Sequence, residues 1–411
     1  MTTKTGLRLR AKVDYIGFVV KHEWPFMLAL VGVLLGVGEF LPSAAALALS
    51  LVAVALGVFQ FVVDYRDMNK RWSEYRFESA TDPFPVADIA MPDSYSEPVR
   101  HVVPGRGTAV SDDAIDRRLR TTSLTAVVDS DAYQLPASLR ATAPQVLGPT
   151  VGSGVVFNGH VLGMSDDPAG VIGARPIRLH RARFFDGQCS NELCRLRIEH
   201  RTSGELYDMR RQTLIDPTGR LAPLSGTELA NIVGISTMAV TTDGQVVLIE
   251  QSRRNSASAA LLAPSGSGSL EPRDLDDLRT DWSLQDLLIR GMNRELAEET
   301  GLAESDIDHT AIVGYARWLE RGAKPEFFGH TRLRVSSAEV SAAVVRGAEQ
   351  LYTSDSVLLD VDLEELGTEI HAGHDVLTAP SCPALVRERG SVPLVLRLRA
   401  VATAIAAPLQ A

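Results

Sequence analysis

Two long apolar runs near the N-terminus dominate the hydrophobic pattern of the chain. Residues 24–41 carry a single charged side chain, Glu39, and residues 43–63 carry none. Each run approaches the ~20 residues that a helix needs to cross a bilayer. Because only Pro42 separates them, the pattern predicts two membrane helices, at about 24–41 and 43–63, that form a tight hairpin.

Basic residues flank this predicted hairpin on both sides, and its turn has none. Cytoplasmic flanks of membrane helices carry an excess of Lys and Arg, so we expect an inner-membrane protein with both termini and its main domain in the cytoplasm. Trp24, Tyr65 and Trp72 occupy positions typical of interfacial aromatic residues. The basic residues are Lys4, Arg8, Arg10, Lys12 and Lys21 before the first run, and Arg66, Lys70, Arg71 and Arg76 after the second.

The apolar runs have two other interpretations. Residues 42–46 (PSAAA) resemble the cleavage site of a signal peptide. The polar lead is long for a signal peptide, and the second run would remain after cleavage. The runs would also suit a buried core hairpin. We favour the membrane hairpin, in which Gly32 and Gly36 offer a close-packing surface for a homo-oligomer.

After the hairpin, the chain divides into a polar stretch and a region with strand patterns. At 411 residues it is long enough for two or three structural units. We predict a transmembrane hairpin over 1–76, a linker and small pre-domain over 77–180, and a larger domain over 181–411. Within these units, residues 112–120 predict a short helix, and strand-like runs lie at 154–157, 177–180 and 193–198.

The clearest strands come just before a glutamate-rich helix. Residues 235–241 and 245–250, joined through Asp243 and Gly244, predict a β-hairpin. The helix has Ser283 as N-cap, Asp286 three residues later and Gly301 at its stop. Further strands are predicted at 311–318 and 327–335, and a closing helix at 394–406. The buried stripe of the glutamate-rich helix comprises Leu284, Leu287, Leu288, Gly291 and Met292.

Three carboxylates crowd the end of this helix, where residues 294–302 read RELAEETGL. Glu295, Glu298 and Glu299 stand at i, i+3 and i+4 and therefore share one helix face. A divalent cation relieves the repulsion between them, and hard cations such as Mg²⁺ prefer carboxylate oxygen. A glutamate-rich helix is usually a solvated face. Here it follows a strand hairpin and a glycine loop, and this context favours a metal site.

Residues 294–302 resemble the second half of the Nudix box, the signature of the Nudix hydrolase superfamily. The full pattern is Gly, five residues, Glu, seven residues, then Arg-Glu-aliphatic-x-Glu-Glu-x-Gly-aliphatic. The first half departs from it, because Asp286 stands eight residues before Arg294 and Thr280 stands in place of the glycine. Gly266 or Gly268 is the expected glycine equivalent, and residues 272–281 would then form a polar insertion before the helix.

The resemblance covers about residues 231–407 and could begin near residue 181. It implies an α/β protein with the α/β/α sandwich and mixed sheet of Nudix domains, preceded here by the two-helix transmembrane hairpin. The enzymes of this superfamily cleave a diphosphate that links a nucleoside to a further group, with Mg²⁺ neutralising the phosphate oxygens.

The same resemblance assigns roles to residues. Glu298 and Glu299 would bind the metal, and Glu295 would bind it or take the proton of the attacking water. Arg294 would orient Glu298 by a salt bridge, and the backbone carbonyl of Gly268 would complete a site for Mg²⁺, or for Mn²⁺ in its place.

Other residues are candidates for substrate contacts. Arg253 and Arg254 follow a strand at the mouth of the expected site, although a solvated turn explains them equally well. Trp318 would stack a nucleobase, but an aromatic residue after a strand is more often part of the core. Glu326, and more weakly Glu320, would supply the carboxylate that family members often add from a later loop.

The net charge and the spacing of Cys and His residues argue against two classes of partner, nucleic acids and zinc. The net charge of −10 argues against nucleic-acid binding. Cys189 and Cys194 have no matching second pair for a zinc site, and His371 and His374 have no third ligand.

These features predict a membrane-anchored, Mg²⁺-dependent hydrolase of a nucleoside diphosphate-linked small molecule, such as a nucleotide sugar, ADP-ribose or a dinucleotide. The alternative is a nucleotide-binding sensor, in which the same fold binds a ligand and signals to the membrane helices. In both cases the partners are the small molecule and the lipid bilayer.

Overall fold

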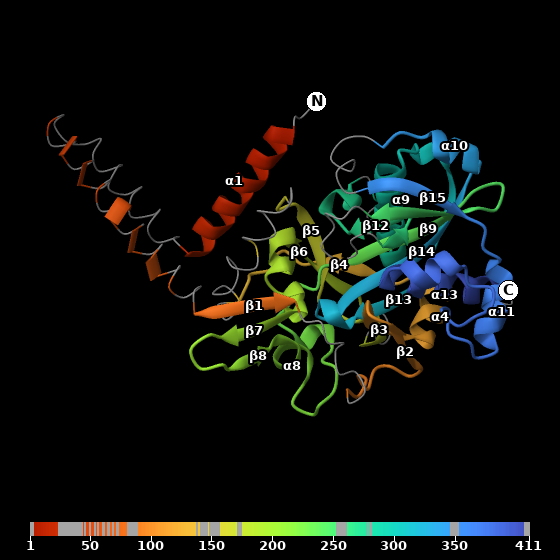
Figure 1. Ribbon diagram of the computed structural model, residues 1–411, viewed down its shortest axis with the longest axis horizontal. Coiled ribbons are helices and arrows are strands. Elements are labelled where there is room, and N and C mark those ends of the chain that lie inside the picture. Colours follow the sequence, from red (N-terminus) through yellow and green to blue (C-terminus); the bar gives the residue numbers. More distant parts are fainter. Residues whose placement is uncertain are drawn as a thin grey trace.

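The computed structural model describes residues 4–23, scattered positions between 44 and 70, and residues 74–79, 89–136, 139, 147, 157–170, 175–251, 261–276, 278, 282–345 and 353–406 (Figure 1). Most of the predicted membrane hairpin, including all of residues 24–41, lies outside this part of the chain. Within it, no helix combines the length and the apolarity needed to cross a membrane. The hairpin and the cytoplasmic placement derived from it stay predictions.

A helix that precedes the predicted hairpin is attached to the body of the protein. α1 (Lys4–Glu23) buries Ala11 and Phe18. The Phe18 ring packs edge-on against Phe185, with ring centroids 5.6 Å apart. α1 is therefore held on the body by core contacts.

The body is built on one large mixed sheet. Its described strands follow the order β11-β10-β9-β14-β13-β3-β2, with β12 added to β9 and β15 added to β10. β9 and β14 run parallel, and the other pairs run antiparallel. In chain order these strands are β2 (Pro98–Val103), β3 (Gly107–Asp112), β9 (Gly234–Val240), β10 (Val246–Gln251), β11 (Leu262–Pro264), β12 (Gly266–Ser269), β13 (Ile307–Trp318), β14 (Lys324–Leu333) and β15 (Thr353–Leu359).

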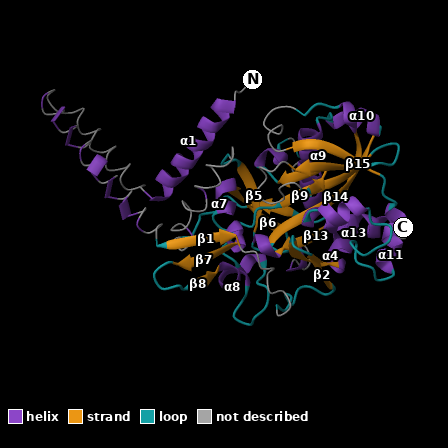
Figure 2. Ribbon diagram, in the orientation of Figure 1, coloured by secondary structure: helices purple, strands orange, loops and turns teal. Residues whose placement is uncertain are grey.

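Helices cover both faces of this sheet (Figure 2). α9 (Leu284–Thr300) packs on one face, where Gly291 lies against Ile235 of β9. α13 (Val392–Ala406) packs on the other face and shares a buried cluster with Met238 of β9 and Phe328 of β14. Side chains alternate between the faces along each strand, so β9 contributes to both layers. The predicted α/β class with a mixed sheet is confirmed.

Two smaller three-stranded sheets flank the large one among the described residues. The first has the order β4-β6-β5, from β4 (Ala126–Val128), β5 (His160–Met164) and β6 (Ile177–Arg183). The second has the order β1-β7-β8, from β1 (Tyr75–Ser79), β7 (Leu196–His200) and β8 (Leu206–Asp208). The other α-helices of the described residues are α4 (Asp113–Thr121), α7 (Phe184–Gln188), α8 (Met209–Leu214), α10 (Ser337–Ala342), α11 (Leu363–His371) and α12 (Ala384–Arg389).

The first small sheet is continuous with the body through the backbone of Leu162 in β5. The Leu162 N–H donates to the Leu270 carbonyl at 2.8 Å, and the Leu162 carbonyl accepts the Val233 N–H at 2.9 Å. β2 and β3 extend the main sheet beside β13. The predicted division of the chain at residue 181 stays a prediction.

Local signals account for several element boundaries. Asp112 caps α4 by accepting the N–H groups of Ala114 and Ile115, so the predicted short helix is confirmed. Gly244 has a φ of 83° between β9 and β10, as the predicted hairpin requires. The strand expected over 193–198 is wrong at its start, because residues 191–195 form a 3-10 turn. Residues 154–156 lie outside the described part, and the strand nearby is β5.

Candidate active site

The glutamate-rich segment forms the C-terminal half of α9. The predicted capping box is present, since Ser283 Oγ accepts the Asp286 N–H and Asp286 Oδ2 accepts the Ser283 N–H at 2.9 Å. Gly301 ends the helix with a φ of 76°. The predicted apolar stripe is buried, and this fixes the rotation of the helix about its axis. The buried residues are Leu284, Leu287, Leu288, Gly291 and Met292.

The glycine loop forms β12, which lies directly against the glutamates. A side chain on Gly268 would collide with the Glu295 carboxylate, and one on Gly266 would lie 2.8 Å from the Leu296 nitrogen. A residue without a side chain allows this close approach of strand and helix. Both expected glycine equivalents thus lie against α9, and Gly268 is the one beside Glu295.

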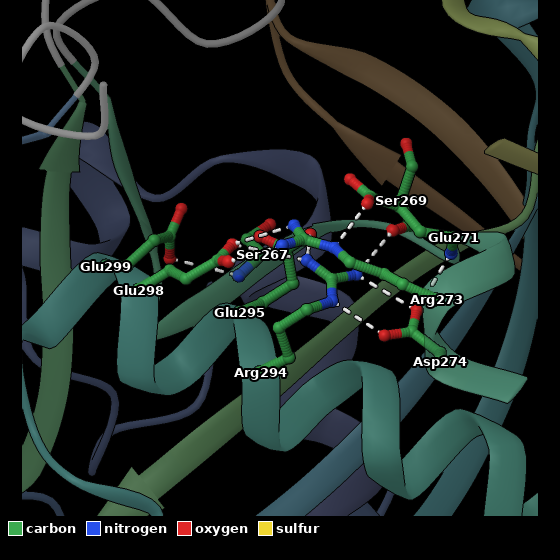
Figure 3. A network of polar contacts seen from close by, with 9 residues as sticks. All are labelled: Ser267, Ser269, Glu271, Arg273, Asp274, Arg294, Glu295, Glu298 and Glu299. Atoms are coloured by element: carbon green, nitrogen blue, oxygen red, sulfur yellow. Dashed lines mark hydrogen bonds and ion pairs between the residues drawn. The ribbon is translucent and has the colours of Figure 1, made fainter. Parts of the chain in front are cut away.

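The three glutamates gather on the side of α9 that faces β12 (Figure 3). Glu295 and Glu299 are only 9% and 7% exposed. The side chain of Glu298 keeps 33% exposure. The Ser267 N–H of β12 donates to Glu299 Oε2 at 3.0 Å. Two of the carboxylates are therefore held in a largely desolvated setting, and the third lies at its rim.

Arg294 connects this carboxylate group to the chain around it. Its Nη1 donates to Glu295 at 2.8 Å and to Glu298 at 3.3 Å, so the predicted salt bridge to Glu298 is present. Its Nη2 also donates to the Ser269 carbonyl at 3.0 Å. Burial opposes the positive charge, but the hydrogen bond to Asp274 and the nearby carboxylates outweigh burial and raise the pKa of Arg294.

The strongest partner of Arg294 is Asp274. Its two oxygens accept Nε at 2.6 Å and Nη2 at 3.0 Å, and its side chain is 1% exposed. Asp274 follows Gly268 by six positions, which is the Gly-x5-Glu spacing of the box. Asp286, which stands eight residues before Arg294, instead caps the start of α9.

Asp274 lies in the 3-10 turn Pro272–Leu275, which directly follows the glycine loop. The count of six residues from Gly268 identifies Asp274 in the sequence, whereas the count of eight residues back from Arg294 leads to Asp286. The insertion expected over residues 272–281 stays a prediction.

The donor set on this face fits a hard cation. Its side-chain ligands are all carboxylates, and oxygen donors suit Mg²⁺ and Mn²⁺. The close approach of Gly268 brings its backbone beside Glu295, as the predicted ligand set requires. The carboxylates contact arginine side chains, and Arg273 Nη1 lies 3.1 Å from Glu298 Oε1. Among the described residues, no group of three or more Asp, Glu, His or Cys side chains is arranged so that it could hold a metal ion.

Glu326 lies on β14, on the sheet face covered by α13. It is 5% exposed and accepts Lys324 Nζ at 2.8 Å. Gly234 of β9 is its partner across the strands, and a side chain there would collide with the Glu326 carboxylate. Glu326 therefore belongs to a strand and not to the later loop that the sequence suggested, and its carboxylate packs over Gly234.

Arg397 is a buried cation that the sequence reasoning missed. It projects from α13, is fully buried, donates to Ser236 Oγ and lies 5.3 Å from the Phe328 ring centroid. Within the described residues its Nε and Nη1 have no hydrogen-bond partner. Burial lowers the pKa of Arg397 to about 9, while attraction to Glu326 and Glu299 opposes the shift. The sequence signal that could have identified Arg397 is its position as a charged residue within the apolar pattern of α13.

The other candidates for substrate contacts are either buried in the core or lie outside the described residues. Trp318 is 5% exposed in the core beneath α13, with the Arg321 guanidinium 5.2 Å from its ring centroid. Glu320 accepts the Thr108 N–H at 2.7 Å, and burial raises its pKa. Arg253 and Arg254 lie outside the described residues, so their contact with substrate stays a prediction.

Comparisons with known proteins leave the family open. No protein-family profile matches the sequence, and no curated protein matches it. The protein DR0079 of Deinococcus radiodurans is similar over 39% of this chain and 89% of its own, at 15% identity and a TM-score of 0.23. The MutT protein of Methanosarcina mazei Go1 is similar over 41% of this chain and 91% of its own, at 18% identity and a TM-score of 0.22. TM-scores this low do not establish a shared fold.

Proposed function

We propose that this protein is a Mg²⁺-dependent hydrolase of the Nudix type, with that family's α/β/α sandwich, that cleaves the diphosphate of a nucleoside diphosphate-linked small molecule. The Arg294 network supports this proposal. It holds Glu295, which lies beside Gly268, and Glu298, with Glu299 on the same helix face. Nucleotide sugars, ADP-ribose and dinucleotides are the proposed substrate class, and Mn²⁺ is the proposed substitute for Mg²⁺.

The role of each residue follows from its position. Asp274 and the Ser269 carbonyl fix Arg294, which in turn orients Glu295 and Glu298. Glu298 and Glu299 would hold the cation, together with the backbone of Gly268. When bound, Mg²⁺ would supply charge neutralisation at the phosphate oxygens.

The reaction needs little covalent help from the protein, because positioning and charge compensation dominate phosphoryl transfer. A water oxygen forms the new bond to phosphorus, and the bond to the leaving phosphate oxygen breaks. The released proton would pass to Glu295, whose carboxylate is largely buried beside Gly268. Alternatively, Glu295 would join Glu298 and Glu299 as a third ligand.

A matched pair of glutamate variants tests the proposal. With Mg²⁺, the wild-type protein should release a nucleoside monophosphate from at least one member of the substrate class. Glu298→Gln should lower the rate by on the order of 10²–10³, as expected for loss of one preorganised electrostatic group. Glu304→Gln, at an exposed position beyond the helix, should retain the wild-type rate. Absence of turnover across a broad panel with either cation, or an unaffected Glu298→Gln, would refute the proposal.

The sensor alternative has one structural observation in its favour. α1 immediately precedes the predicted membrane segment, and Phe18 anchors it in the core of the body. A ligand that alters this packing would act directly beside the membrane. Tight nucleotide binding without turnover, with a ligand-dependent change in oligomeric state, would favour a sensor over an enzyme.

The proposed membrane anchor is tested separately. The full chain should stay in the membrane fraction after an alkaline carbonate wash, and a chain lacking residues 24–63 should not.

A further inference from the structure

A cavity of about 510 Å³ lies between α1 and the ends of β5 and β6. This volume falls within the range of small-molecule sites. α1 provides one wall, the loop before residue 136 provides another, and the ends of β5 and β6 provide the floor. Of the lining residues, the argument uses Asp14, Gly17, His160, Arg181, Arg183 and Asp186.

Gly17 is the residue of α1 that leaves the cavity wall without a side chain. It lies near the C-terminal end of a 20-residue helix, where glycine costs about 0.5–1 kcal/mol relative to alanine. A Cβ at Gly17 would meet no atom of the described residues within 4 Å, so their packing does not exclude a side chain. Gly291 of α9 differs, because a Cβ there would lie 2.6 Å from Ile235. Gly17 is exposed and lines the cavity, so a larger side chain at this position would extend into open space beside α1.

The floor of the cavity carries two arginine side chains and a histidine, which can donate hydrogen bonds. Arg181 and Arg183 are two positions apart on β6, so their side chains leave the same face of the strand, roughly 7 Å apart. His160 of β5 is the cross-strand partner of Arg183. In the part of the chain that the structure describes, the Arg181 guanidinium has no hydrogen-bond or ion-pair partner. Arg183 donates to the Asn158 carbonyl at 3.3 Å.

The two carboxylates of the lining each accept a backbone donor. Asp14 Oδ2 accepts the Asn158 N–H at 3.0 Å, and Asp186 Oδ2 accepts the Arg183 N–H at 2.8 Å. Among the described residues no ion pair joins either carboxylate to Arg181 or Arg183, although Asp186 has a further interaction. The Arg181 guanidinium, and the N–H groups of Arg183 that do not reach Asn158, are available to an acceptor from outside the chain.

We propose that this cavity is a binding site for a small organic phosphate. A phosphate monoester offers three acceptor oxygens to two guanidinium groups, and arginine binds phosphate through paired N–H donors. The cavity is larger than a bare phosphate ion, and Phe18 and Tyr133 line it beside the basic floor. The organic part of the ligand would occupy the space next to Gly17. The bound molecule would bridge α1 and β6.

This site is separate from the carboxylate group of α9, and its test does not depend on hydrolysis. We would titrate AMP, inorganic phosphate and adenosine into the full chain in lipid nanodiscs by calorimetry, with EDTA present to remove divalent metal. AMP should bind with one site per chain, and adenosine, which lacks the phosphate, should bind at least tenfold more weakly. Equal binding of AMP and adenosine, or no binding of AMP and phosphate, would overturn the proposal.

Two variants locate the binding within the cavity. Gly17→Leu fills the open space, and Arg181→Ala removes an exposed donor without disturbing a described contact. Each should weaken AMP binding tenfold or more. Arg332→Ala, at an exposed arginine of β14 outside the cavity, should bind AMP as the wild type does. Wild-type affinity in both cavity variants would place the ligand elsewhere and refute the proposal, and circular dichroism would verify that each variant is folded.

Discussion

Removal of the Asp274 carboxylate should destabilise the protein more than any exposed substitution near the site. Asp274→Asn abolishes the charge that accepts two N–H groups of Arg294, at 2.6 and 3.0 Å, in a nearly buried setting. Hydrogen bonds to charged groups contribute about 1.5–3 kcal/mol each. Loss of one partner of a buried pair costs about 3–5 kcal/mol. Arg294 keeps Glu295, Glu298 and the Ser269 carbonyl, so we expect a loss near the lower bound, about 3 kcal/mol.

Urea unfolding of matched variants measures this loss. Asp286→Asn is the control, because Asp286 is exposed and serves only the capping box of α9, a change worth about 1 kcal/mol. Combining Asp274→Asn with Arg294→Gln should cost less than the sum of the two single changes, with a coupling of about 2 kcal/mol. If Asp274→Asn costs no more than Asp286→Asn, or if the two costs add, the pair does not hold the site as we describe.

Three further changes test other parts of the molecule. Gly268→Ala would place a methyl group against the Glu295 carboxylate, so hydrolysis should fall by on the order of 10²-fold, measured as nucleoside monophosphate release. Arg397→Met would replace a buried cation with two unpartnered nitrogens by an apolar side chain, so the urea midpoint should hold or rise. Burial raises the pKa of Asp116 to about 7, although the Tyr315 N–H that it accepts opposes the shift. Because the folded value exceeds the unfolded value of 3.8, stability relative to Asp116→Asn should fall as pH rises from about 4 to 7, by about 1.4 kcal/mol per unit in urea titrations.

Each of these outcomes has a clear opposite. An unchanged hydrolysis rate in Gly268→Ala would mean that the close approach of β12 to α9 is not needed for catalysis. A fall of several kcal/mol in Arg397→Met would mean that the cation is a net contributor to stability. Parallel pH profiles for the wild type and Asp116→Asn would mean that this carboxyl group ionises normally in the folded protein.

The helix that carries the glutamates was predictable because its signals are local. Ser283, Asp286 and Gly301 fix its two ends, and the apolar stripe fixes the face that it buries. The shared face of the three glutamates then follows from helix geometry alone. The same reasoning gave the β9–β10 hairpin, whose turn needs a glycine with positive φ.

The contacts that organise the site depend on distant segments and could not be predicted in the same way. Asp274 reaches Arg294 because a 3-10 turn brings it back over α9, and sequence spacing shows only that it follows Gly268 by six positions. Arg397 belongs to a helix whose apolar pattern was clear, but the strands that it crosses, at Ser236 and Phe328, are set by tertiary packing. Trp318 illustrates the same limit, because its burial depends on the helix that covers β13.

The attachment of both α1 and β1 to the body restricts how residues 24–73 can be oriented relative to it. Phe18 fixes the chain before this segment, and the pairing of Tyr75 with His200 fixes it afterwards (Figure 1). Two attachment points allow the body fewer orientations relative to the intervening segment than one attachment point would. If residues 24–63 cross the bilayer as the sequence predicts, the body would therefore present one constant face to the lipid surface.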